Sequence, residues 1–161
     1  MDISKLHVLT MISNPVRFKS RYRLYEEFRQ HMEDAGVNLH TVEVIFGDRP
    51  AAIQGPNVLH LRTKSELWHK ENALNLLVER LPSDWEYLAW VDADVQFTHW
   101  RGDKSWFRET VQQLQHHRIV QLFESAIDLG PNDEVLQVHK GFAASYVQGQ
   151  PLPNRDHTPY Y

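Results

Sequence analysis

Apolar residues recur in short runs along the first part of the chain, and polar or proline-containing segments separate these runs. Residues 6–12 form a mostly apolar run that leads into a polar loop, which predicts a buried strand. Aromatic side chains at helical spacing over residues 20–35, closed by Gly36, predict an amphipathic helix. Residues 39–46 are rich in β-branched side chains. The pattern therefore predicts a strand, a helix and a second strand.

The alternation continues beyond residue 50. Residues 58–61 predict a short strand, and Ser65 is the expected N-cap of a helix that ends at Pro82. The apolar face of that helix is expected to contain Leu67, Leu74, Leu77 and Val78. Residues 87–91 are apolar throughout, which predicts a central strand covered by helices on both sides.

Two further elements complete the predicted fold. Residues 103–117 predict a helix, and residues 119–123 predict another strand. Strands that alternate with helices indicate an α/β fold with a mostly parallel central sheet flanked by helices. We expect the strands near 6–12, 40–46, 86–92 and 118–123 to share this sheet.

The expected domain organisation is simple. Residues 1–148 are expected to form one domain, and residues 149–161, which contain three prolines, a loop or tail. No closing helix is evident before the final Pro-Tyr-Tyr. The chain is therefore expected to be either a truncated domain or a compact one.

Composition and charge exclude several classes of protein. Seventeen basic and 21 acidic residues give a net charge of −4, which argues against binding nucleic acid through phosphate neutralisation. The absence of cysteine removes disulfides, cysteine-ligated metals and thiol nucleophiles. No segment approaches the about 20 apolar residues that span a bilayer, and no signal peptide is evident. We therefore expect a cytoplasmic protein without a transmembrane segment.

Two aspartates follow the apolar run at 87–91 directly, and they form the pattern Asp92-Ala93-Asp94. Residues two apart in an extended segment point the same way, so both carboxylates can converge on one cation. Mg²⁺ and Mn²⁺ prefer oxygen ligands, and one or two carboxylates together with substrate phosphates make a typical site. Such a pair also arises by chance, and the alternative is a solvated loop after a strand.

Two segments resemble the GT-A glycosyltransferases, which move a sugar from a nucleotide diphosphate donor. Residues 87–95 are similar to the segment that carries the DXD motif of this family. Upstream, residues 70–75 are similar to the helix start that precedes the motif, with a basic residue, an asparagine and small or aliphatic residues. The resemblance covers residues 5–125 and implies a single GT-A domain, which is Rossmann-like.

The resemblance also implies roles for particular residues. Asp94 would bind Mn²⁺ or Mg²⁺, and Asp92 would bind the metal or the donor ribose. His139 or His157 would be a third metal ligand. The donor, a UDP- or GDP-sugar, would lie against the first loop, the second strand and the start of the helix before the motif, at Ser13, Asn14, Arg17, Glu43, Lys70 and Asn72. At the second strand, Asp48 is the alternative acid to Glu43.

The catalytic base stays unassigned at this point. A base is needed if the reaction inverts, because the acceptor hydroxyl must lose its proton. Beyond the aspartate pair, Asp128 and Glu124 are the weak candidates, and neither belongs to a motif.

Two other functions remain open. A haloacid-dehalogenase-like phosphatase also has an Asp-x-Asp pair after an apolar strand, although normally after the first strand of its fold. The other alternative is a non-catalytic module that binds nucleotide sugars or partners. Transfer or hydrolysis of a nucleotide sugar would separate the enzyme from the module.

Overall fold

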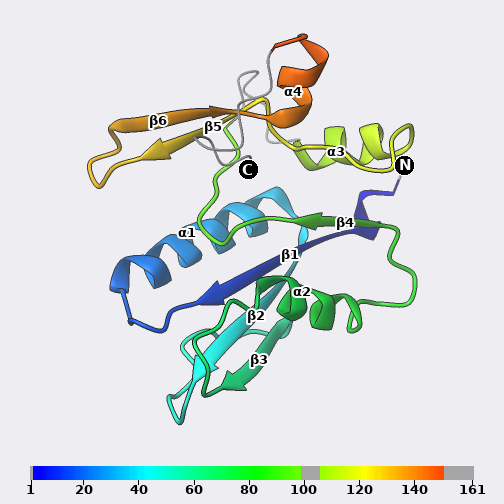
Figure 1. The fold of residues 1–161 in the computed structure, drawn as a ribbon. Coiled ribbons are helices and arrows are strands. Elements are labelled where there is room, and N and C mark those ends of the chain that lie inside the picture. The colour runs from blue at the N-terminus through cyan, green and yellow to red at the C-terminus, as the bar shows by residue number, and fades with distance from the viewer. Residues whose placement is uncertain (1, 99–105, 151–161) are drawn as a thin grey trace. The chain divides into compact units, whose positions relative to one another are not determined.

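The computed structural model describes residues 2–98 and 106–150 of the chain (Figure 1). The chain divides into two compact units, Met1–Gln112 and Gln113–Tyr161. Each unit is described by itself below. In the described residues, no helix combines the length and the apolar character that crossing a membrane requires.

The first unit contains a parallel sheet of four strands. They are β1 (Leu6–Ser13), β2 (Asn38–Phe46), β3 (Val58–Thr63) and β4 (Tyr87–Trp90), and a short 3-10 helix, η1 (Ile3–Lys5), precedes β1. The strand order is β3-β2-β1-β4, and each neighbouring pair is parallel. The predicted α/β class and the parallel sheet are confirmed.

Two helices cover opposite faces of this sheet (Figure 1). Helix α1 (Lys19–Ala35) lies on one face, where the hydroxyl groups of Tyr25 and Thr41 share a hydrogen bond of 3.0 Å. Helix α2 (Lys70–Val78) lies on the other, where its leucines pack in a cluster with Val42. Thr41 and Val42 are adjacent in β2, so their side chains point to opposite faces. The sheet is therefore covered on both sides, as in Rossmann-like folds.

Gly36 ends α1 as its position predicts. Its backbone is left-handed, with φ of 71°, and its N–H donates to the carbonyl groups of Glu33 and Met32. A left-handed residue at this position satisfies carbonyl groups that the last helical turn leaves open.

The predicted start of the next helix is wrong, because Ser65 lies in a turn before it. The hydroxyl of Ser65 accepts a hydrogen bond of 3.3 Å from the N–H of Leu67, so it caps a local turn and not a helix. Helix α2 begins only at Lys70, after His69. The side chain of Leu67 is 72% exposed and lies outside the helix, which corrects its predicted place on the apolar face. The two predicted leucines within α2, Leu74 and Leu77, are buried as expected.

Strand β4 is an edge strand and not the predicted central strand. Among the described residues it pairs with β1 alone, and Trp90 at its end is 56% exposed. The apolar character of residues 87–91 therefore does not mean that both faces of β4 are buried. The central strands are β1 and β2, whose buried residues follow one another without alternation.

The predicted strand at 119–123 is wrong. Ile119 is 88% exposed, and the strands of this region are β5 (Ser125–Leu129) and β6 (Val135–Lys140). They pair antiparallel in a sheet of their own, so they do not extend the parallel sheet. A tight turn, with a Gly130 N–H to Glu134 carbonyl bond of 2.8 Å, makes local pairing accessible without a crossover.

The remaining two α-helices of the described residues follow β4 and β6 in the chain. Helix α3 (Trp106–Leu114) lies within the predicted helix at 103–117, whose first three residues lie outside the described part of the chain. Its Trp106 ring stacks on Phe97 with 4.2 Å between ring centroids. Helix α4 (Phe142–Val147) follows β6.

A histidine pair at the amino end of the sheet predicts a pH-dependent stability. Nδ1 of His7 and Nε2 of His40 lie 2.9 Å apart. Burial, and then the neighbouring His7, lowers the pKa of His40 to about 4, so the folded protein resists its protonation. The stabilising contribution is complete above the ordinary histidine pKa of about 6.5 and is lost as the pH falls towards 4.

Between these pH values the wild type should lose free energy of unfolding, because His40 becomes protonated more readily in the unfolded chain. The glutamine of His40→Gln cannot titrate, so we expect the loss in this variant to be smaller by on the order of 2 kcal/mol. Denaturant unfolding of both proteins at a series of pH values measures this difference. Parallel pH profiles for the two proteins would contradict the assignment.

Candidate functional site

The order of the strands marks one place on the sheet for a ligand. From β1 the chain passes to β2 and β3 on one side, and it then crosses to β4 on the other side of β1. The order therefore reverses between β1 and β4. In open parallel sheets, ligands bind outside the carboxyl ends of the strands at such a switch point. Ser13 ends β1 here, and Asp92 follows β4 two residues after Trp90.

Lys70 and Asp92, both predicted as donor-binding residues, are brought together at this point. Their side chains form an ion pair, and Lys70 Nζ lies 5.5 Å from the centroid of the Trp90 ring. Lys70 is the first residue of α2, so the pair joins the start of this helix to the end of β4. The Lys70 side chain is 17% exposed and that of Asp92 is 48% exposed. Solvent therefore reaches the carboxylate more freely than the ammonium group.

Asp94 lies beside this pair. Partial burial of its carboxyl group, and then the negative charge of Asp92, raises the pKa of Asp94. The positive charges of Arg21 and Lys70 act in the opposite direction and only partly offset these effects. Two carboxylates whose charges disfavour each other are an arrangement that a cation stabilises.

Arg21 lies between the ends of β1 and β4 in its interactions, and it is one of four basic residues at positions 17–23 that follow the first strand in the sequence. Its Nη1 donates a hydrogen bond of 2.7 Å to the Ser13 carbonyl, and its charge acts on Asp94. Arg21 lies in the first turn of α1, which follows β1 after a short loop. The sequence marks Arg21 as one of these clustered basic residues, and the structure adds its hydrogen bond with Ser13 and its electrostatic effect on Asp94.

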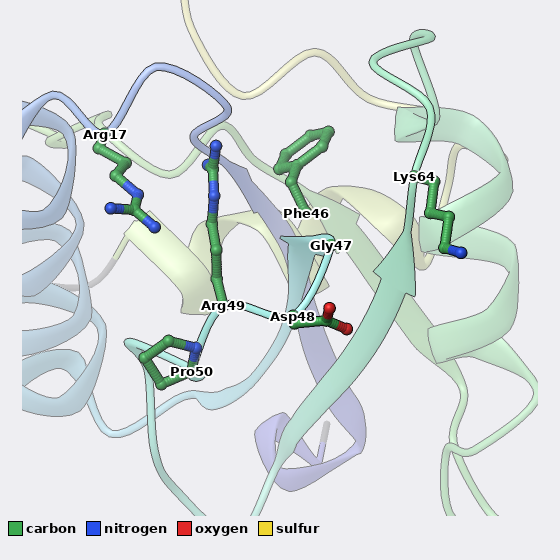
Figure 2. Close-up of a pocket in the computed structure, with 7 residues that line it drawn as sticks. All are labelled: Arg17, Phe46, Gly47, Asp48, Arg49, Pro50 and Lys64. Atoms are coloured by element: carbon green, nitrogen blue, oxygen red, sulfur yellow. The ribbon is translucent and has the colours of Figure 1, made fainter.

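The loop after β1 is shaped by Asn14. This side chain is buried; its Nδ2 donates to the Phe18 carbonyl at 2.9 Å, and its Oδ1 accepts from the Phe18 N–H at 3.0 Å. Arg17 lies within this closed loop with a φ of 64°, a conformation that non-glycine residues rarely adopt. Its side chain is exposed and lines a cavity with Arg49 (Figure 2). Asn14 therefore positions the loop, and Arg17 presents its charge from it.

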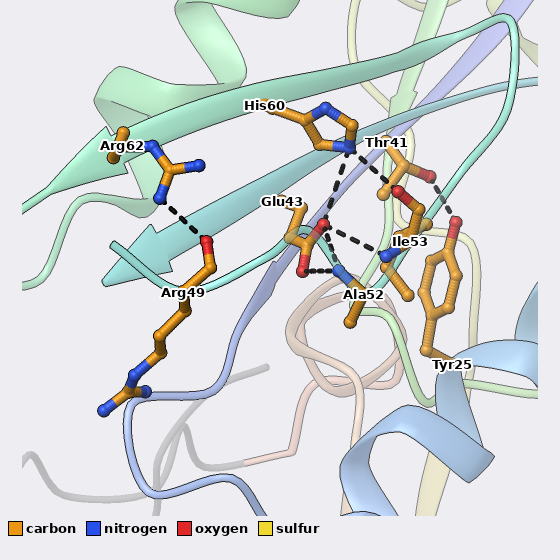
Figure 3. Close-up of polar contacts among 8 residues, drawn as sticks. All are labelled: Tyr25, Thr41, Glu43, Arg49, Ala52, Ile53, His60 and Arg62. Carbon is orange, nitrogen blue, oxygen red and sulfur yellow. Dashed lines mark hydrogen bonds and ion pairs between the residues drawn. The ribbon is translucent and has the colours of Figure 1, made fainter. Parts of the chain in front are cut away.

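Glu43 makes contacts that stabilise another loop. The side chain is 4% exposed in the middle of β2, and its carboxylate accepts hydrogen bonds from the N–H groups of Ala52 at 2.9 Å and Ile53 at 3.1 Å (Figure 3). Nε2 of His60 lies 3.5 Å from the same carboxylate. Contact of Glu43 with a donor stays a prediction. The exposed acid after β2 is Asp48.

We expect Glu43→Ala to lower the free energy of unfolding by about 2–4 kcal/mol, because two N–H groups of the loop lose a charged acceptor. Denaturant unfolding measures the change. Glu26→Ala is the matched control, since Glu26 forms an exposed ion pair with Arg29 on α1 and should cost less than about 1 kcal/mol. Equal effects of the two substitutions would show that Glu43 does not hold the loop.

The remaining predicted residues are distributed over both units. Asn72 is exposed in the first turn of α2, two residues after Lys70. His139 and Asp128 face each other in the β5–β6 hairpin of the second unit, with 2.9 Å between His139 Nε2 and the Asp128 carboxylate. Glu124 of the same unit accepts a hydrogen bond of 3.2 Å from Gln148.

The predicted metal ligands do not form a complete protein site. Within residues 2–98 and 106–150, no group of three or more histidine, aspartate or glutamate side chains could hold a metal ion. His139 as a third ligand stays a prediction, and His157 lies outside the described residues. Asp92 and Asp94 are thus two carboxylates that need ligands from elsewhere to complete a metal's coordination.

Comparison with known proteins adds no assignment. No protein-family model matches the chain, and neither the curated proteins nor the solved structures include a significant match.

Proposed function

We propose that the chain is a GT-A-type glycosyltransferase that moves a sugar from a UDP- or GDP-sugar to an acceptor hydroxyl. The observation that carries this proposal is the position of Asp92 and Asp94 at the reversal of strand order between β1 and β4. Two carboxylates, a paired lysine and an arginine meet at the edge where parallel sheets bind nucleotides. If the aspartates belonged only to a solvated loop, nothing would require these four charged side chains to lie together.

The residues present fit a bound Mn²⁺ or Mg²⁺. These hard cations take oxygen ligands, and sites that work on phosphates often use one or two carboxylates and leave the other positions to phosphate oxygens and water. Asp94 and Asp92 would hold the cation. When bound, it would supply positive charge for the departing nucleoside diphosphate.

The side chains around the aspartates have separate tasks in this proposal. Lys70 neutralises Asp92 in the absence of ligand, and it would donate to the diphosphate when the donor binds. Arg21 holds the end of β1 close to Asp94. Ser13 and Asn72 border the same edge and would contact the donor, and Asp48 or Glu43 would contact its base.

The catalytic base of the proposed transfer stays a prediction. Asp128 and Glu124 are the proposed choices for the base that accepts the proton of the hydroxyl. Asp128 already pairs with His139, and this contact would orient its carboxylate. We propose a cytoplasmic location as part of the same hypothesis.

The proposal is tested by incubating the chain with Mn²⁺, a panel of UDP- and GDP-sugars and a mixture of simple sugars as acceptors. The nucleoside diphosphate released as the sugar passes to an acceptor hydroxyl or to water is measured. The expected result is release from one donor, lost in the presence of a chelator. Saturable donor binding without release would instead identify a non-catalytic module. Hydrolysis of p-nitrophenyl phosphate in place of donor turnover would identify a phosphatase.

A further inference from the structure

A second group of charges lies at the same edge of the sheet, on the other side of β1. It surrounds a cavity of about 570 Å³ (Figure 2). We call it the basic pocket, and its lining consists of Arg17, Phe46, Gly47, Asp48, Arg49, Pro50 and Lys64. The proposed transferase site uses none of these residues except Arg17 and Asp48.

Three neighbouring strands supply the pocket. Arg17 comes from the loop after β1, Arg49 from the loop after β2, and Lys64 from the residue after β3. Parallel strands end at one edge, so three residues far apart in the sequence meet there.

The charge of the pocket is unbalanced. Three cationic side chains share it with one carboxylate, that of Asp48. In the part of the chain that the structure describes, no ion pair involves Arg17, Arg49 or Lys64. Figure 2 shows the side chains of Arg17 and Arg49 beside each other, with the Asp48 carboxylate pointing away from them. Like charges held together favour an anion between them.

The side chain of Arg49 and the backbone of Arg17 are held in place before any ligand arrives. Nη1 of Arg49 donates to the Pro15 carbonyl at 2.7 Å, and its guanidinium carbon lies 5.9 Å from the centroid of the Phe46 ring. Arg62 of β3 donates to the Arg49 carbonyl at 2.8 Å (Figure 3). Arg17 lies in the loop that the buried Asn14 closes. Binding an anion here therefore costs little ordering of the protein.

We propose that the basic pocket binds a phosphate group of a small molecule. A guanidinium group matches phosphate oxygens with parallel N–H donors, and a dianion balances more of the excess charge than a monoanion does. The negative net charge of the chain argues against a nucleic acid as the source of the phosphate. Arg49 and Lys64 of the pocket have no part in the proposed donor site, so the effects of substituting them test this proposal separately from sugar transfer.

The test is calorimetric titration of the full chain with inorganic phosphate, glucose 6-phosphate and glucose, at low salt and with a chelator present. We expect the two phosphates to bind and glucose not to bind. Tighter binding of glucose 6-phosphate than of inorganic phosphate would assign the pocket to a phosphorylated metabolite, and equal binding would assign it to free phosphate.

Arg17→Gln should weaken phosphate binding about tenfold, since one charge-assisted contact is lost. Arg49→Gln should weaken it similarly, and Lys64→Gln less. Arg23→Gln is the matched control, because Arg23 is an exposed arginine of α1 paired with Glu27, and it should bind phosphate like the wild type. Asp94→Asn should also leave phosphate binding unchanged.

Absence of phosphate binding, or wild-type affinity in a folded Arg17→Gln variant, would overturn the proposal. So would an equal loss in Arg23→Gln, which would show attraction to the whole surface. Circular dichroism of each variant establishes that it is folded.

Discussion

Asp94→Asn is expected to weaken metal-dependent binding of the nucleotide-sugar donor by about 100-fold or more. The substitution keeps the size of the side chain but removes its negative charge, and a neutral amide is a poor ligand for a hard cation. The fold should remain, because Asp94 lies in the segment that follows the edge strand β4 and is outside the sheet. Isothermal titration of UDP- and GDP-sugars with Mn²⁺ measures the effect.

Asp34→Asn is the matched control for this result. Asp34 is an exposed aspartate in the last turn of α1, where it accepts a hydrogen bond of 2.9 Å from Gln30. It should bind the donor like the wild type. Asp92→Asn should have a smaller or equal effect, according to whether Asp92 meets the metal or the ribose. Wild-type donor affinity in Asp94→Asn would show that the aspartate pair is only a polar strand end.

Lys70→Met is expected to weaken binding of a nucleoside diphosphate about tenfold or more, because a charge-assisted hydrogen bond contributes about 1.5–3 kcal/mol. The same change leaves Asp92 without its ion-pair partner. The affinity of the free protein for Mn²⁺ should therefore stay the same or rise. Opposite effects on nucleotide and metal distinguish a direct phosphate contact from general damage to the site.

Titrations with Mn²⁺ alone, and with UDP or GDP at saturating Mn²⁺, measure the two affinities separately. Lys5→Met is the matched control. Lys5 directly precedes β1, and it forms a similar ion pair with Asp84, which precedes β4. It should leave both affinities unchanged. If Lys70→Met lowers the affinities for metal and nucleotide equally, Lys70 positions the aspartates and does not contact the diphosphate.

The hydrophobic pattern predicts most elements of the first unit, because the central strands are continuous apolar runs, α1 has helical spacing of its aromatic residues, and polar segments end them. It does not predict where a strand lies in the sheet. The run at 87–91 is as apolar as a central strand, yet β4 pairs only with β1 among the described residues. Strand order depends on which edge the α2 crossover reaches, and local composition does not encode this.

The second unit differs from its prediction for a related reason. The strand at 119–123 rests on β-branched and aromatic residues alone. The observed hairpin depends instead on the turn between Gly130 and Glu134, which lets β5 and β6 pair locally. Turn geometry outweighs apolar content here.

The candidate site could be predicted only in part. Lys70 and Asp92 were both predicted to contact the donor, because their segments resemble known motifs, but their ion pair with each other was not predicted. The contacts of Glu43 were not predictable, because the loop that brings Ala52 and Ile53 to it has no periodicity. Arg21 and Arg49 act through backbone carbonyls of distant loops, which a sequence pattern does not show.

The most direct test of the central claim is a titration of the wild-type chain with UDP-glucose and GDP-mannose, with Mn²⁺ and again with excess chelator. We expect saturable binding of one donor with Mn²⁺, reduced at least about tenfold by the chelator, because the cation that would offset the charges of the diphosphate and the aspartates is then removed. Equal binding in both conditions, or binding of neither donor with Mn²⁺, would contradict it.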